Sequence, residues 1–318
     1  MSKKYTGYVM NKFYECFYNN DRGNVIRKDA ADKFCVHYDY KVPTVDTHTG
    51  LLLTVKQLVD KAKSVNRTPC IFYSGGIDSE IILNAFLELG YKSGEDFHCI
   101  HAVYDVDQNK CDTVFVDDFV NKHNLNIEIV HLETINWYRS QECFDYCIKH
   151  NLSYVTMSQM TRLMEMMYDK NYYPIIGHGD PQIYRYNGIV YHSDYEFQNS
   201  WNKFLVMNSM EGCSNFFRET ADLYINYVND FAKHIDPNTE YNELDFWNFN
   251  SPTLKYTVFH FYEMIKRDKF TGHEEYRTEE INQINLRLQE HTKYNFSNRL
   301  IRNIEYFKNN SFSYENII

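Results

Sequence analysis

The chain has 318 residues, 43% of them hydrophobic and 24% charged, which is the composition of a globular protein with one or two domains. Acidic residues outnumber basic ones by 43 to 33, and the resulting formal charge of -10 argues against general nucleic-acid binding, which depends on cationic contacts to phosphate. Apolar stretches are shorter than the roughly 18 residues that span a bilayer, and no apolar secretory core follows the start, so we expect a cytoplasmic protein outside the membrane.

Residues 1–68 carry mixed signals and predict an N-terminal extension. Its aromatic start, residues 5–18, favours a helix, residues 34–45 read as extended chain, and residues 51–63 form an amphipathic helical pattern. The pattern becomes much clearer from Pro69 onward.

Residues 69–195 predict an α/β domain. The expected strands are 70–73, 97–104, 127–132 and 172–176, and the expected helices are 78–89, 114–124, 137–150 and 155–170. This alternation is typical of a parallel sheet flanked by helices. The segments 183–186 and 189–192 flank Asn187-Gly188, a two-residue turn that predicts a β-hairpin.

Residues 196–318 predict a mostly helical region that packs on the α/β domain. The expected helices are 214–234, 253–266, 278–289 and 298–307, with breaks marked by Pro237 and Pro252. The chain therefore divides into an extension, an α/β domain and a helical C-terminal region.

The eight cysteines are scattered and include no CxxC motif, which is typical of reduced thiols in a cytosol. Cys143 and Cys147 lie one helical turn apart, with His150 close behind. This spacing suits either a metal or redox pair, or a helix face in which cysteine acts as a small apolar residue. We favour the apolar interpretation.

The loop Ser74-Gly75-Gly76-Ile77-Asp78-Ser79 stands between the first strand and the first helix of the predicted domain. A glycine pair in this position lets the backbone approach a phosphate, and amides at the helix N-terminus point at the anion. Because the carboxylate of Asp78 repels polyphosphate unless a divalent cation lies between them, the loop predicts ATP together with Mg²⁺. The alternative is an ordinary strand-to-helix turn in which the aspartate caps the helix.

Neither G-x-x-x-x-G-K-[ST] nor G-x-G-x-x-G is present. Instead, the loop resembles the SGGxDS signature of the PP-loop ATP pyrophosphatases. The resemblance covers about residues 68–190 and implies a parallel sheet of about five strands, the adenine nucleotide alpha hydrolase-like, Rossmann-like fold. It also implies that ATP lies across the carboxyl ends of the strands and is cleaved between its α and β phosphates.

A second motif, Gly177-His178-Gly179-Asp180, follows the fourth expected strand. With it, the chain most resembles the synthetase domain of asparagine synthetases. The match implies that Asp78 and Asp180 are metal ligands and catalytic residues. The residues implied to bind ATP and pyrophosphate are Ser74, Gly75, Gly76, Ile77, Asp78, Ser79, Gly177, His178 and Gly179. For His178, contact with phosphate and simple support of the loop are both open, and the whole motif has the alternative of a polar loop without chemistry.

The chain departs from that family in two places. Only residues 1–68, beginning Met1-Ser2, precede the α/β domain, so we expect no built-in glutaminase, and a separate amidotransferase or another nitrogen source becomes a candidate partner. After Asp180 the chain runs Pro181-Gln182-Ile183-Tyr184-Arg185-Tyr186, where the family has an acidic and glycine-rich sequence. The acceptor pocket is therefore expected to differ.

These features favour an AMP-forming ligase that adenylates a carboxylate or carbonyl oxygen of a small molecule and transfers the activated group to ammonia or an amine. Departure of pyrophosphate needs a cation, and the candidates are Lys255, Arg277 and Lys293. Of these, we place Lys255 among the catalytic residues. One alternative is a thiolation enzyme acting on a nucleic-acid base, or a sulfonucleotide reductase-like enzyme, which requires a reactive cysteine or an iron-sulfur site. Another is a nucleotide-binding module without catalysis.

Overall fold

The computed structural model describes residues 14–19, 33–38, 45–105, 109–178, 182–186, 189–195, 200–234, 252–264, 278–292, 299–303 and 312–315. Its helices are α1 (Thr47–Ser64), α2 (Ile77–Glu88), α3 (Lys110–His123), α4 (Ile135–Arg139), α5 (Gln141–Lys149), α6 (Val155–Asp169), α7 (Ser200–Met207), α8 (Ala221–Lys233), α9 (Pro252–Val258) and α10 (Glu279–Thr292), with a 3₁₀ helix at Phe216–Arg218. Its strands are β1 (Tyr14–Asn19), β2 (Lys33–Tyr38), β3 (Thr68–Phe72), β4 (His98–Tyr104), β5 (Glu128–Leu132), β6 (Tyr172–Ile175), β7 (Gln182–Tyr186), β8 (Ile189–Tyr195), β9 (Arg299–Asn303) and β10 (Phe312–Glu315). Within these ranges, no helix combines the length and apolar character needed to cross a bilayer.

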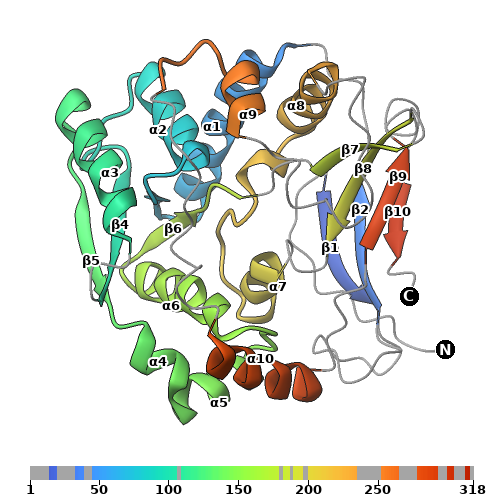
Figure 1. Ribbon diagram of the computed structural model, residues 1–318. Helices are drawn as coiled ribbons and strands as arrows, with labels where there is room; N and C mark the ends of the chain where they lie inside the picture. Colours follow the sequence, from blue (N-terminus) through green and yellow to red (C-terminus); the bar gives the residue numbers. More distant parts are fainter. Residues whose placement is uncertain are drawn as a thin grey trace.

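A parallel sheet with the strand order β5-β4-β3-β6 forms the centre of the molecule (Figure 1). Cys70 of β3 aligns with His98 of β4 on one side and with Pro174 of β6 on the other. The chain therefore moves from β3 outward to β4 and β5, and then crosses back to add β6 at the other edge of β3. This order confirms the predicted α/β class, with four strands in the described part of the sheet where about five were expected.

The two faces of β3 contribute to separate cores because successive strand residues point to opposite sides of a sheet. Ile71 and Tyr73 join a core with side chains from α1, α2, α3 and α8. Cys70 and Phe72 join a second core with side chains from α6 and α7. Figure 1 shows α1 and α2 on one side of the sheet and α6 and α7 on the other.

Helix α1 lies within the predicted N-terminal extension and packs against β3, α2 and α8. It begins after Asp46, whose side chain accepts a 2.7 Å hydrogen bond from the backbone N–H of Thr49, which is a standard N-cap. The division into an extension, an α/β domain and a C-terminal region stays a prediction.

Two smaller antiparallel sheets have the orders β1-β2-β10 and β7-β8-β9. The predicted hairpin is confirmed, since Ile183 in β7 pairs with His192 in β8. Two helix predictions are wrong: residues 14–19 form β1 and residues 299–303 form β9. β1 pairs with β2, the next strand along the chain, and β9 pairs with β8, which is far away in sequence. In both cases the pairing satisfies the backbone hydrogen bonds and overrides a short local pattern.

The predicted helix 137–150 is interrupted at Ser140 and becomes α4 and α5. Ser140 has an extended backbone, with φ -76° and ψ 148°, and its side chain accepts a 3.0 Å hydrogen bond from the N–H of Cys143. Serine in this role starts a new helix because its oxygen satisfies a first-turn amide. The helical spacing of apolar residues continues across Ser140, and for this reason the sequence pattern predicts a single helix.

Cys143 and Cys147 are buried in a small core between α4, α5, α6 and α10. The sulfur of Cys143 lies 3.4 Å from the hydroxyl of Ser158. Burial lowers the pKa of the neighbouring His150 to about 4, so its ring is neutral near pH 7. In the described ranges, no group of three or more His, Cys, Asp or Glu side chains could hold a metal ion, and the burial of both cysteines supports their interpretation as apolar residues.

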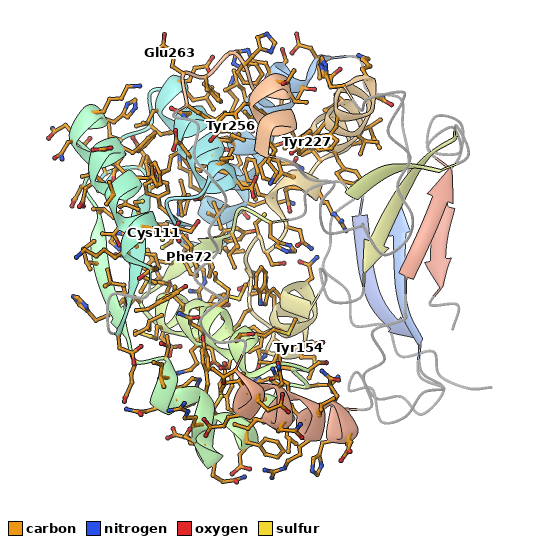
Figure 2. All side chains as sticks on the ribbon, viewed as in Figure 1. Phe72, Cys111, Tyr154, Tyr227, Tyr256 and Glu263 are labelled. Atoms are coloured by element: carbon orange, nitrogen blue, oxygen red, sulfur yellow. The ribbon has the colours of Figure 1, made fainter. Side chains whose placement is uncertain are left out.

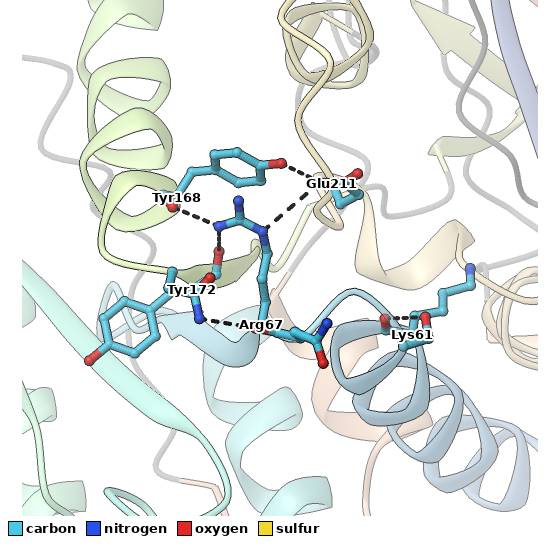
Figure 3. Close-up of polar contacts among 8 residues, drawn as sticks. Lys61, Arg67, Tyr168, Tyr172 and Glu211 are labelled. Atoms are coloured by element: carbon cyan, nitrogen blue, oxygen red, sulfur yellow. Dashed lines mark hydrogen bonds and ion pairs between the residues drawn. The ribbon is translucent and has the colours of Figure 1, made fainter.

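Arg67 joins the amino-terminal ends of β3 and β6 (Figure 3). Its guanidinium donates to the carbonyl oxygens of Tyr168, at 2.6 Å, and Tyr172, at 3.3 Å, and lies 3.3 Å from the centroid of the Tyr168 ring. Glu211 lies 4.0 Å away, and the Tyr168 hydroxyl donates to the same carboxylate. A planar, charged group that donates and stacks at once cannot be replaced by a lysine ammonium.

We predict that Arg67→Lys lowers the free energy of unfolding by about 1–3 kcal/mol, because the two carbonyl groups lose a charge-assisted donor and the ring loses its stacked cation. Denaturant unfolding measures the change. Lys92→Ala is the control, since the Lys92 side chain is 68% exposed, and it should change stability by less than about 0.5 kcal/mol. Equal stability of Arg67→Lys and the parent chain would contradict the assigned role.

Candidate functional site

The predicted glycine loop lies at the point where the order of the central sheet reverses. Its first residue, Ser74, comes two positions after the end of β3, and α2 starts at Ile77. Since β4 and β6 lie on opposite sides of β3, the strand order reverses at β3, and this topology predicts a crevice at the carboxyl ends of β3 and β6. Open α/β sheets bind ligands at this position.

Gly75 gives the loop its shape. It has a positive φ of 80°, and a Cβ atom placed on it would lie 2.5 Å from the carbonyl oxygen of Asp112 in the first turn of α3. Both the backbone conformation and the space exclude other residues. The backbone of the loop therefore lies directly against the first turn of α3, with no room for a side chain between them.

Serine side chains close the loop internally. The hydroxyl of Ser79 accepts a 3.2 Å hydrogen bond from the Ser74 N–H and donates to the carbonyl of Gly76 at 3.0 Å. The Gly76 N–H donates to the hydroxyl of Ser74, also at 3.2 Å. Gly76 is the N-cap of α2 and provides no side-chain cap, so the positive end of the helix dipole faces the crevice.

Asp78 does not cap α2. Instead, its two carboxylate oxygens accept hydrogen bonds from the ammonium group of Lys255 in α9, at 2.6 and 2.8 Å. The Lys255 side chain is only 4% exposed, whereas Asp78 is 25% exposed. A buried ammonium needs such a partner, because an uncompensated charge in the interior is strongly destabilising.

Of the three cations considered for pyrophosphate departure, the structure thus brings Lys255 to the loop. Arg277 and Lys293 lie outside the described residues. Spacing along the chain cannot identify this pair, because Lys255 is separated from Asp78 by 177 positions.

The loop after β6 meets the glycine loop at Gly177. A Cβ atom on Gly177 would lie 3.0 Å from the backbone nitrogen of Ser79 and 3.1 Å from the carbonyl carbon of Asp78. Glycine at this position therefore lets the two predicted loops touch. Gly179 and Asp180, which complete the second motif, lie outside the described residues, so their assigned roles stay predictions.

His178 is fixed by residues that the sequence analysis did not find. Its Nδ1 donates to the side-chain oxygen of Asn215 at 3.1 Å, and its ring lies edge-on to that of Trp201, with centroids 4.7 Å apart. Asn215 is buried, and nothing in its local sequence marks it. These contacts support the reading in which His178 holds the loop, while contact with a phosphate stays a prediction.

The 3₁₀ helix also binds this loop through its backbone. The N–H of Phe216 donates to the carbonyl of Ile176, and the N–H of Phe217 donates to the carbonyl of His178, both at 3.3 Å. The carboxyl end of β6 is therefore held by main-chain contacts as well as by the histidine ring.

His101 supports the strand end from the neighbouring strand β4. Its Nδ1 donates to the carbonyl of Tyr73 at 2.9 Å, and its Nε2 lies 3.2 Å from the hydroxyl of Thr113. Burial lowers the pKa of His101, so the ring is neutral and acts as a structural donor.

The described residues of the site provide one of the carboxylates that a Mg²⁺ ion bound to a nucleotide would need. Magnesium in nucleotide sites takes one or two carboxylates and completes its shell with phosphate oxygens and water. Asp78 has the right chemistry and lies beside the helix N-terminus, a position that suits phosphate binding, and a second carboxylate is expected at Asp180.

A scan against protein-family models and a search of curated proteins found no match to this chain.

We predict that Gly75→Ala destabilises the protein more than Gly90→Ala. Both glycines have a φ of 80°, but a Cβ atom on Gly90 meets nothing within 4 Å. Gly90→Ala should therefore lose about 1 kcal/mol from backbone strain alone, and Gly75→Ala about 1–3 kcal/mol more from the contact with Asp112. Thermal and denaturant unfolding compare the two, and equal losses would show that the loop does not touch α3.

Proposed function

We propose that this protein is an ATP-dependent, AMP-forming ligase of the PP-loop type. It would adenylate a carboxylate or carbonyl oxygen of a small molecule, release pyrophosphate and transfer the activated group to ammonia or an amine. The observation that carries the proposal is the juxtaposition of the 74–79 loop with a buried lysine, Lys255, at the reversal point of a parallel sheet. A cytoplasmic location and a small-molecule substrate belong to the same proposal.

The site has the features that departure of pyrophosphate requires. The first-turn amides of α2 and the hydroxyl of Ser74 would supply donors for phosphate oxygens, and the Ser79 hydroxyl would join them on leaving the Gly76 carbonyl. Lys255 supplies a positive charge in a largely dry environment, where it stabilises developing negative charge more strongly than in water. Asp78, with Asp180 as the second expected ligand, would hold Mg²⁺, which neutralises polyphosphate charge when it is bound.

The reaction we propose has two displacements. An oxygen of the substrate carboxylate attacks the α-phosphorus, the bond between the α-phosphorus and the bridging oxygen breaks, and pyrophosphate leaves. The amine nitrogen then attacks the activated carbon, the bond from carbon to the phosphate oxygen breaks, AMP leaves and the nitrogen loses a proton to solvent. Positioning and charge stabilisation suffice for both steps, so no protein nucleophile is needed.

Assays of pyrophosphate release and ATP-pyrophosphate exchange across a panel of carboxylate metabolites test the proposal. We predict that Asp78→Asn lowers the exchange rate by about 100-fold, because the loop loses its metal ligand and the partner of Lys255. Asp118→Asn, an exposed carboxylate on α3, is the control and should stay within about twofold of the parent chain.

Full exchange activity in Asp78→Asn would disprove the assignment of the metal ligand. If no metabolite supports exchange in the parent chain while ATP still binds at equilibrium, the protein is a nucleotide-binding module and the ligase proposal fails.

The alternative, a thiolation or sulfonucleotide reductase-like enzyme, would require a reactive thiol near the loop. Among the cysteines in the described residues, only Cys111 is exposed, and it precedes Asp112, the residue whose carbonyl meets Gly75. Cys111 is labelled in Figure 2. Burial raises the pKa of Cys99 and Cys213, so those two are unreactive thiols.

We predict that Cys111→Ser keeps both pyrophosphate exchange and product formation, because adenylation supplies the leaving group and no thiol takes part. Product formation followed by mass spectrometry makes the test. Loss of turnover with exchange intact would instead place a sulfur-transfer step after adenylation.

A further inference from the structure

The ion pair between Asp78 and Lys255 occupies both carboxylate oxygens that the proposed function assigns to a metal ion. An ammonium group and a divalent cation cannot share these oxygens at full strength, because like charges a few ångströms apart repel. We therefore expect binding of a metal at Asp78 to weaken or break at least one of the hydrogen bonds that Lys255 makes to this carboxylate. Such a movement of Lys255 is possible only if other contacts keep α9 packed on the protein.

The α9 segment, defined here as residues 252–264, has anchors that do not involve Lys255. Phe259 is fully buried, and its ring lies edge-on to Tyr227 of α8 with centroids 4.9 Å apart. Figure 2 labels Tyr227 and Tyr256, which come from α8 and from α9. The aromatic contact therefore holds the segment on α8 whichever group Lys255 binds.

A second anchor lies at the far end of α2. The hydroxyl of Tyr262 donates to the carboxylate of Glu88 at 2.9 Å, and His48 lies at the same distance from that carboxylate. Asp78 and Glu88 are ten residues apart on one helix, or about 15 Å along its axis. The α9 segment is thus attached at both ends of α2, and the anchor at Glu88 persists if the contact at Asp78 is broken.

We propose that Lys255 is a latch that neutralises Asp78 in the nucleotide-free protein and changes partner when the metal and the polyphosphate bind. In the free state, Lys255 satisfies the carboxylate and lowers the affinity of the site for a bare divalent cation. When phosphate oxygens enter at the N-terminus of α2, the ammonium moves to them and Asp78 is released to the metal. The latch rests on the proposed function and makes metal binding depend on nucleotide.

Binding of Mn²⁺ in the absence of nucleotide, measured by electron paramagnetic resonance titration, tests the latch without requiring activity. We expect Lys255→Met to bind Mn²⁺ about tenfold or more tightly than the parent chain, because one positive charge next to Asp78 is removed. The gain should disappear in the double variant with Asp78→Asn. Lys61→Met is the matched control: it breaks the ion pair between Lys61 of α1 and Glu219, which follows the 3₁₀ helix, and should bind Mn²⁺ like the parent chain.

An unchanged Mn²⁺ affinity in Lys255→Met, or a gain that survives Asp78→Asn, would overturn the proposal. Lys255→Gln, which keeps a hydrogen-bond donor and removes the charge, serves if the methionine variant does not fold, and the same gain is expected. Because this titration contains no ATP, it separates the two proposals. Tighter Mn²⁺ binding by Lys255→Met, together with no pyrophosphate exchange in the parent chain, would support the latch and refute the ligase. Unchanged Mn²⁺ binding, together with pyrophosphate exchange, would support the ligase and refute the latch.

A second measurement uses the parent chain. With nitrogen-15 in the lysine side chains, the Nζ resonance of Lys255 should shift when Mg²⁺ and α,β-methylene-ATP are added together, and stay in place with Mg²⁺ alone. A shift of equal size with Mg²⁺ alone would show that the metal displaces the lysine without nucleotide, which contradicts the latch.

Discussion

The position of β3 between β4 and β6 is the constraint on which the rest of the structure depends. Two parallel neighbours on opposite sides of one strand place the reversal of strand order at β3, and a crevice at the carboxyl ends is expected from that topology. The glycine loop, the loop after β6 and α9 all meet there. Arg67 secures the same two strands, β3 and β6, at the other end of the sheet.

The parts of the fold that the sequence predicted are those with a strong local signal. Apolar period and glycine position predicted the strands at 70–73 and 172–176 and the helix from Asp78, and all three are confirmed. Turn chemistry predicted a hairpin, and the antiparallel pairing of β7 with β8 confirms it. The helix break at Ser140 was not predicted because it depends on the capping hydrogen bond of that serine, and strand β9 was not predicted because it forms by pairing with the distant strand β8. Local pattern contains neither kind of information.

The candidate site divides in the same way. Gly75 and Gly177 were identified from sequence; a Cβ atom on Gly75 would collide with backbone at 2.5 Å, and one on Gly177 would lie tightly against it at 3.0 Å. Lys255 was predicted as a catalytic residue, with Arg277 and Lys293 as further candidate cations, but its contact with Asp78 and that of Asn215 with His178 have no local signal because they join elements far apart in the chain. Sequence spacing predicts what a loop can bind, whereas the partner of a buried charge is set by tertiary packing.

Main-chain atoms set part of the geometry around these loops: a Cβ atom on Gly75 would meet the carbonyl of Asp112, one on Gly177 would meet the nitrogen of Ser79, and the amides of Phe216 and Phe217 donate to carbonyls of the β6 loop. A carbonyl or an amide stays in place whatever side chain its residue carries. The side chain of residue 112 can therefore change without moving the carbonyl that meets Gly75, whereas Phe216 and Phe217 are fully buried and substitutions there would also disturb the core beneath the β6 loop.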